Sequence, residues 1–136
     1  MGTKRIGLAR MEALVENLKR EIVLGGTTLN DLRVAVEASQ EGGANSGGAT
    51  ALSATIPMSL CATDTSKTHF SLAAGNAGQI KIIVHATRAN AADCIVTPAS
   101  FAGGSTLTSD ANGRILVLVS DGTNWHAIES AGWAIA

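Results

Sequence analysis

The stretch Gly78-Gln79-Ile80-Lys81-Ile82-Ile83-Val84-His85 decides the fold class of this chain. It alternates two polar residues, Gln79 and Lys81, with apolar ones, and then becomes wholly apolar at Ile82-Ile83-Val84. A β-strand that is apolar on both faces has to be covered on both faces. The stretch therefore predicts a strand inside a sheet whose two sides are both packed.

Further strand-like segments lie before and after this stretch, bounded by Gly, Asn or Pro. They cover residues 52–61, 68–72, 94–98, 103–108 and 114–120. Asp121-Gly122-Thr123-Asn124 is a turn signal, and it predicts a final hairpin between residues 115–120 and 125–130. Short strands at such spacing predict a mainly β chain, built as an antiparallel β-sandwich or barrel.

An amphipathic α-helix is predicted at the start of the chain, over residues 3–24. Its apolar residues are spaced alternately three and four apart: Leu8, Met11, Val15, Leu18 and Ile22. This spacing places them on one seam, and Gly25-Gly26 ends the helix. Two heptads are too short for a stable coiled coil alone, so the helix has to pack on its own β-domain, on a neighbouring protein or in a self-associated bundle.

The length of 136 residues predicts one domain with an N-terminal extension. Residues 1–26 form a helical arm in this division. Residues 27–50 hold a half-buried strand, predicted over 29–38, followed by a Gly-rich linker. Residues 51–136 form the β-module.

The composition favours assembly with other subunits. Charged residues make up only 15% of the chain, against roughly 25% in an average globular protein. The hydrophobic fraction is 46%, and much of it is Ala. Such a chain exposes neutral or weakly apolar faces that a partner subunit can bury. A net charge of -1 predicts no nucleic-acid partner.

The start of the chain carries a small group of basic residues, Lys4, Arg5 and Arg10. They form either a local basic arm or the solvated face of the predicted helix. No apolar run here or later is long enough to span a bilayer or to serve as a signal peptide. The sequence therefore predicts no membrane contact and synthesis in the cytoplasm.

The residues that could carry chemistry show no catalytic or metal-binding pattern. His69, His85 and His126 have no ligand-like spacing, so they are interpreted as hydrogen-bonded strand histidines, with a histidine cluster on a threefold axis as the alternative. No Gly-x-Ser-x-Gly motif and no carboxylate pair stands out. We predict that the chain is not an enzyme and has no cofactor or metal.

Cysteine usage and the C-terminal tryptophan give weaker signals. Cys61 and Cys94 lie in separate segments without Cys-x-x-Cys spacing, which predicts two buried free thiols, with a disulfide as the alternative. Trp125, next to His126 and a turn, could line a sugar-binding groove. A tryptophan on a terminal strand is more typical of a core or of a subunit interface.

Several motifs occur in an order and spacing that resemble a β-module of small virion proteins from tailed marine bacteriophages, including cyanophages. The motifs are Leu72-Ala73-Ala74-Gly75-Asn76-Ala77-Gly78-Gln79-Ile80-Lys81-Ile82-Ile83, Val96-Thr97-Pro98, Gly103-Gly104-Ser105-Thr106-Leu107-Thr108 and Asp121-Gly122-Thr123-Asn124-Trp125-His126. The resemblance covers roughly residues 66–132, and the opening Lys4-Arg5-Ile6-Gly7-Leu8-Ala9-Arg10 is also similar.

The resemblance implies a virion structural protein on the capsid surface, namely a homotrimeric decoration (cement) protein that stabilises the head. A small tail, neck or head-fibre component built on the same trimeric module is the alternative. The major capsid protein or another virion protein is the implied partner.

A threefold assembly of this kind implies two sets of contact residues. The interface between subunits is expected to bury Leu8, Met11, Val15, Leu18, Ile22, Ile82, Val84, Ile115, Val117, Val119 and Trp125. Contact with the capsid is expected from Lys4, Arg5 and Arg10.

Overall fold

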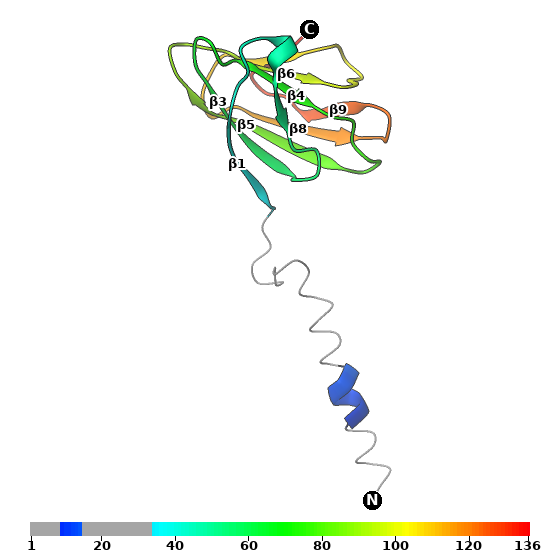
Figure 1. Ribbon diagram of the computed structural model, residues 1–136. Coiled ribbons are helices and arrows are strands. Elements are labelled where there is room, and N and C mark those ends of the chain that lie inside the picture. The colour runs from blue at the N-terminus through cyan, green and yellow to red at the C-terminus, as the bar shows by residue number, and fades with distance from the viewer. Residues whose placement is uncertain (1–8, 15–33) are drawn as a thin grey trace, which may run out of the picture. The chain divides into compact units, whose positions relative to one another are not determined.

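A computed structural model describes residues 9–14 and 34–136 of the chain. Residues 9–14 are helical and fall within the helix predicted over 3–24. The chain divides into two units, Met1–Val34 and Ala35–Ala136. The strands drawn in Figure 1 belong to the second unit.

The second unit is mainly β. Its strands are β1 (Val36–Glu41), β2 (Thr50–Leu52), β3 (Met58–Thr63), β4 (His69–Leu72), β5 (Ile80–Arg88), β6 (Cys94–Pro98), β7 (Leu107–Ser109), β8 (Ile115–Ser120), β9 (Trp125–Glu129) and β10 (Trp133–Ile135). A short 3₁₀ helix, η1 (Ser46–Gly48), precedes β2. The strands form two five-stranded sheets, in the orders β1-β3-β5-β8-β9 and β10-β7-β6-β4-β2. The prediction of a mainly β chain is therefore confirmed.

The two sheets are consistent with the expected β-sandwich, but the expectation that its strands are antiparallel is wrong, because both sheets are mixed. Strands β1, β3 and β5 run parallel in the first sheet, and β2, β4 and β6 run parallel in the second. From β1 to β6 the chain alternates between the two sheets from one strand to the next. Two successive strands of one sheet are therefore separated by a strand of the other sheet, which carries the chain back to its starting end. Neighbouring strands of the same sheet then run in the same direction. The Gly-rich corners thus connect the two sheets and do not form tight hairpins.

The last part of the chain is antiparallel. β8 pairs antiparallel with both β5 and β9, and β7 pairs antiparallel with β6 and β10. The hairpin predicted across residues 121–124 is confirmed, since Ser120 and Trp125 are paired at its base. Gly122 has a φ of 95° in this turn, a conformation that favours glycine.

The hydrophobic core lies between the two sheets and takes inward-facing residues from strands β2 to β10. Its members are Leu52, Cys61, Phe70, Leu72, Ile83, Cys94, Val96, Leu107, Leu116, Leu118, Trp125 and Trp133. The Trp125 ring packs against Gly75, where an added Cβ would lie 2.5 Å from the ring. The indole Nε1 donates a 2.9 Å hydrogen bond to the carbonyl of Ala73. This corner therefore needs glycine at position 75.

The segment predicted over residues 27–50 as strand and linker is described from residue 34 onward. Its part from Ala35 belongs to the compact unit, where β1 is the edge strand of the first sheet. Gly43 pairs with His69 of β4, and the Asn45 side chain accepts hydrogen bonds from the amides of Gly47 and Gly48, at 3.0 Å each. Backbone pairing and this cap order a stretch whose composition alone is typical of a flexible loop.

Among the residues that the structure describes, no helix has the length and apolar character needed to cross a membrane.

Candidate functional site

The central strand β5 shows how the first sheet separates its two faces. Lys81, Ile83 and His85 are fully buried and point into the interior. The residues between them point outward, because successive side chains of a strand alternate between faces. Ile80 is 50% exposed on this outer side, and Ile82 and Val84 are half-buried by their neighbours. The outer side of β5 is therefore aliphatic, whereas its inner side carries a lysine and a histidine.

The neighbouring strands continue this outer surface in register. Met58 of β3, Ile82 of β5 and Val117 of β8 form one row across the sheet. Leu60, Val84 and Ile115 form the next row, and Ile80 pairs with Val119 beyond. We call this surface the apolar face; it consists of Met58, Leu60, Ile80, Ile82, Val84, Ile115, Val117 and Val119. It contains no charged or polar side chain.

The two edge strands border the apolar face differently: β1 continues it with Val36, whereas β9 places His126 opposite Val119 and Glu129 opposite Val117, beside the exposed Ile128. Val36 of β1, which is in register with Met58, is 51% exposed, and Ile128 of β9 is 62% exposed. Soluble monomers rarely present a contiguous aliphatic surface across several strands, and larger surfaces of this kind mark sites of association. The apolar face is therefore the strongest candidate for a functional surface on this unit.

The outer face of the second sheet has a different character. Its central rows bring together His69, Ile95 and Thr108, and next to them Ser71 and Thr97. Most of these side chains have hydroxyl or imidazole groups that water can solvate. The unit is thus two-sided, with one aliphatic and one largely polar outer surface.

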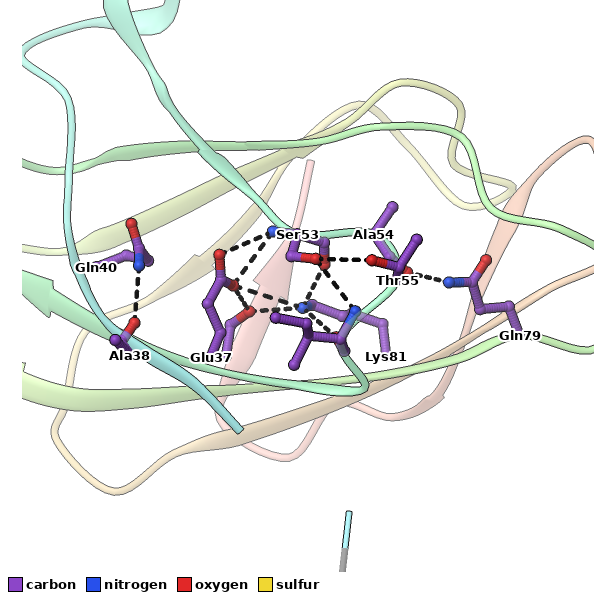
Figure 2. Close-up of polar contacts among 10 residues, drawn as sticks. Glu37, Ala38, Gln40, Ser53, Ala54, Thr55, Gln79 and Lys81 are labelled. Carbon is purple, nitrogen blue, oxygen red and sulfur yellow. Dashed lines mark hydrogen bonds and ion pairs between the residues drawn. The ribbon is translucent and has the colours of Figure 1, made fainter. Parts of the chain in front are cut away.

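A buried polar cluster lies beneath the apolar face (Figure 2). The Lys81 ammonium donates hydrogen bonds to the carbonyls of Ser53, at 2.6 Å, and Ile56, at 2.8 Å, and to the hydroxyl of Ser59, at 2.5 Å. The Glu37 carboxylate lies 3.9 Å from the ammonium and accepts hydrogen bonds from the Ser59 hydroxyl and the Ser53 amide. Every donor of the lysine is therefore used within the protein.

These contacts connect elements that are distant in the sequence. Glu37 belongs to the edge strand β1, Ser59 to β3 and Lys81 to β5. Ser53 and Ile56 lie in the loop that carries the chain from β2 in the second sheet to β3 in the first. The lysine thus ties the edge strand and a crossover loop to the centre of the first sheet.

The surroundings of Lys81 argue for a structural role. Burial lowers the pKa of the Lys81 ammonium, against the opposing effect of the Glu37 charge. A lysine of lowered pKa beside a serine hydroxyl is a combination used in nucleophilic catalysis. Here, however, both Lys81 and Ser59 are fully buried. No substrate atom can approach the Ser59 hydroxyl in this arrangement. The geometry therefore favours a structural role for Lys81, which holds neighbouring elements together.

The second buried polar group is His85, which lies between two hydroxyls. Its Nε2 is 2.9 Å from Thr63 Oγ1, and its Nδ1 is 3.0 Å from Ser109 Oγ. Burial is the main cause that lowers the pKa of this imidazole, and the nearby Arg88 charge adds to it. Ser109 belongs to β7 of the second sheet, so a neutral His85 bridges the two sheets through hydrogen bonds.

The structure brings five of the residues expected at a subunit interface onto one surface. Ile82, Val84, Ile115, Val117 and Val119 all belong to the apolar face. The expectation for Trp125 differs from the structure: its side chain is only 1% exposed and packs inside the core of the same chain. Its ring fills the space above Gly75, so it is not offered to a second subunit.

The predictions made for the N-terminal arm fall mostly outside the described residues. Those outside are Lys4, Arg5, Leu8, Val15, Leu18 and Ile22. Met11 and Arg10 lie in the helical residues 9–14, where both are exposed, Met11 at 67%. The pairing of this segment with any partner stays a prediction.

Sequence reasoning missed the buried cluster of Glu37, Ser59 and Lys81. The signal that could have found Lys81 is its position in β5. It lies two and four residues before Ile83 and His85, so the three side chains point to the same, inner face of the strand. A lysine at such a position needs polar partners. The identity of those partners could not be predicted, because Glu37 and Ser59 come from other strands.

The three histidines lie at three separate places. His69 is on the outer face of the second sheet, His85 is in the interior, and His126 is on β9, where its Nε2 is 2.7 Å from Asp121 Oδ2. Within residues 9–14 and 34–136, no group of His, Cys, Asp and Glu side chains has the arrangement of a metal site. Cys61 and Cys94 are both free and buried, as predicted.

Comparisons with known proteins add no relative. No protein-family model, curated protein or solved structure matches this chain.

Proposed function

We propose that this chain is a virion structural protein, a trimeric capsid decoration (cement) protein that binds the outer head surface and stabilises the capsid. The observation that carries the proposal is the apolar face, an uncharged aliphatic surface on one sheet opposite a largely polar one. The resemblance of residues 66–132 to a β-module of marine phage virion proteins supports the same function.

The chemistry of the apolar face favours another copy of this chain as its partner. Burial of aliphatic surface contributes roughly 25 cal/mol per Å², whichever apolar surface covers it. A face without charges has no electrostatic means to select a foreign protein, whereas every copy of the chain presents the same aliphatic rows. Three such faces can meet around a threefold axis as the walls of a triangular prism.

The interior of the unit suits a mechanical role. Lys81 and His85 connect edge strand, crossover loop and both sheets through buried hydrogen bonds. A rigid sandwich of this kind can transmit mechanical force from one of its contact surfaces to another without catalysing a reaction. Attachment to the major capsid protein would come from the basic residues of the arm, Lys4, Arg5 and Arg10. Three arms on one trimer bind with higher avidity than one.

The first test is the native mass of the full-length chain, measured by light scattering and native mass spectrometry. We expect three times the chain mass of 13.8 kDa. A monomer at micromolar concentration would remove the reason to propose an assembly module, and a dimer would contradict the threefold arrangement.

The second test addresses the attachment. Full-length protein and a variant lacking residues 1–24 are incubated with undecorated phage capsids, and cosedimentation is measured. We expect trimers of the full-length chain to bind and the truncated protein to bind much more weakly. Truncated trimers that decorate capsids normally would exclude the arm from attachment. Full-length trimers that ignore capsids but bind isolated tails or necks would favour the alternative, a tail, neck or head-fibre component.

A further inference from the structure

We infer that Cys61 and Cys94 form a redox-sensitive cross-link between the two sheets, open as two thiols under reducing conditions and closed as a disulfide after oxidation. The inference concerns each single chain. It holds whether or not the chain assembles as proposed above.

The positions of the two cysteines carry the inference. Cys61 lies in β3 of the first sheet and Cys94 at the start of β6 in the second. Both are fully buried members of the same core cluster. Strands β3 and β6 approach each other to within 8 Å between Cα atoms, although stacked sheets usually lie about 10 Å apart. A disulfide requires Cα atoms about 4.4–6.8 Å apart, so the two strands that carry the cysteines come close to the separation that a cross-link needs.

The contact between the thiols supports the same inference. A hydrogen bond with the Cys61 thiol is the main cause that raises the pKa of Cys94, followed by burial. The raised pKa disfavours the thiolate, which is the reactive form. Oxidation of the folded protein by solution reagents is therefore slow, and the cross-link closes when the chain folds, or transiently opens, in an oxidising medium.

The oxidant is a low-molecular-weight disulfide such as oxidised glutathione. One cysteine thiolate attacks a sulfur of this disulfide, displaces one glutathione thiolate and forms a mixed disulfide. The second cysteine thiolate then attacks the protein sulfur of the mixed disulfide and displaces the second glutathione. The protein loses two electrons and two protons, and one oxidised glutathione becomes two reduced glutathione molecules.

The cross-link would connect the two sheets through the core. It closes a loop that contains both β4 and β5, and such a loop restricts the unfolded chain more than a short one does. For a loop of this length in a unit of this size, we expect the melting temperature to rise by roughly 10 °C or more. A protein that folds in a reducing compartment and later meets an oxidising one would thus gain stability there slowly, as the chain transiently opens.

The test compares protein refolded in reduced and in oxidised glutathione. Each sample is denatured, treated with iodoacetamide and measured by intact mass spectrometry. We expect the oxidised sample to take up no label and to be two hydrogens lighter. A non-reduced digest should contain the peptides of Cys61 and Cys94 joined together, and dithiothreitol should restore both labels and the lower melting temperature.

The variant Cys61→Ala is the matched control. It should keep one labelled thiol and melt at the same temperature in both buffers. Two labels on wild-type protein after oxidising refolding, or only glutathione adducts and cross-linked chain pairs, would overturn the inference. The comparison of oxidised with reduced wild type needs no substitution, so it remains decisive even where the variant folds poorly.

Discussion

At the scale of the residue, Lys81 is a position where a substitution is expected to affect folding strongly. Its side chain is fully buried and donates to two carbonyls and one hydroxyl, with the Glu37 carboxylate nearby. Removing one partner of a buried pair leaves the other charge without compensation. The cost of a substitution therefore comes mainly from the groups left behind.

We predict that Lys81→Met lowers the free energy of unfolding by about 3 kcal/mol or more, because two carbonyls lose their donor and Glu37 loses the positive charge beside it. Urea unfolding monitored by circular dichroism measures the change. Lys67→Met is the matched control, since Lys67 pairs with Glu41 on the surface, and such pairs contribute little. Equal effects of the two substitutions would contradict the role given to Lys81.

His85 gives a prediction for acid pH. Burial lowers the pKa of His85 below its ordinary value of 6.5. Below pH 6.5 the unfolded chain therefore binds a proton that the folded chain resists, and stability falls as the pH drops toward the lowered pKa. This group contributes a slope of up to roughly 1.4 kcal/mol per pH unit in that window.

The variant His85→Gln isolates this contribution, because glutamine can hydrogen-bond to Thr63 and Ser109 without titrating. We expect the wild type to lose stability more steeply than the variant below pH 6.5, and the two curves to run parallel above it. Unfolding free energies from urea titrations at a series of pH values measure the difference. Parallel curves throughout the acid range would refute the assignment.

At the scale of the element, strands β3, β5 and β8 decide how the unit meets other molecules. Their outward residues form the apolar face, and their inward residues fill the core. Because the two sets alternate, a change on the outer side leaves the core contacts of the same strand in place. Association and folding can therefore be separated by substitution.

We predict that Val84→Asp converts the assembly to monomers, because a carboxylate in the middle of the apolar face would be buried without a partner. Thr97→Asp, on the central strand β6 of the other sheet, is the matched control and should keep the native mass. Size-exclusion chromatography with light scattering measures both, and circular dichroism checks the fold. A Val84→Asp protein that keeps the native mass would show that the assembly uses another surface.

At the scale of the whole molecule, the proposed trimer couples folding to association. A protein that is stabilised by binding its own copies becomes more stable as its concentration rises. We therefore expect the melting temperature of the full-length protein to increase over a hundredfold range of concentration, whereas that of Val84→Asp stays constant. Differential scanning calorimetry measures both. A concentration-independent melting temperature in the wild type would argue against an assembly held by the apolar face.

The local patterns of the chain predicted much of the secondary structure. The alternation in residues 78–85 and 114–120 matches β5 and β8, and the turn at 121–124 lies where the hairpin was expected. Two parts of the apolar face were also named in advance, Ile82 with Val84 on β5 and the outward residues of β8. These predictions succeeded because side-chain alternation is a property of the single strand.

The arrangement of the strands could not be predicted in the same way. Turn signals led to an antiparallel sandwich, whereas the corners between β1 and β6 carry the chain from one sheet to the other. A Gly-rich corner permits both routes, since its flexibility says nothing of where the next strand pairs. The expectation that Trp125 lies at a subunit interface failed for a related reason: its burial in the core against Gly75 depends on a contact between distant parts of the chain.

The sequence by itself determined that the chain is mainly β, where several strands begin and end, and which residues alternate along them, because these features depend on neighbours within a few residues. The tertiary structure alone decided the parallel order of the strands, the inward placement of Lys81 against Glu37 and Ser59, and the meeting of Cys61 with Cys94. Those contacts join residues from different strands, so they exist only once the two sheets have been packed against each other.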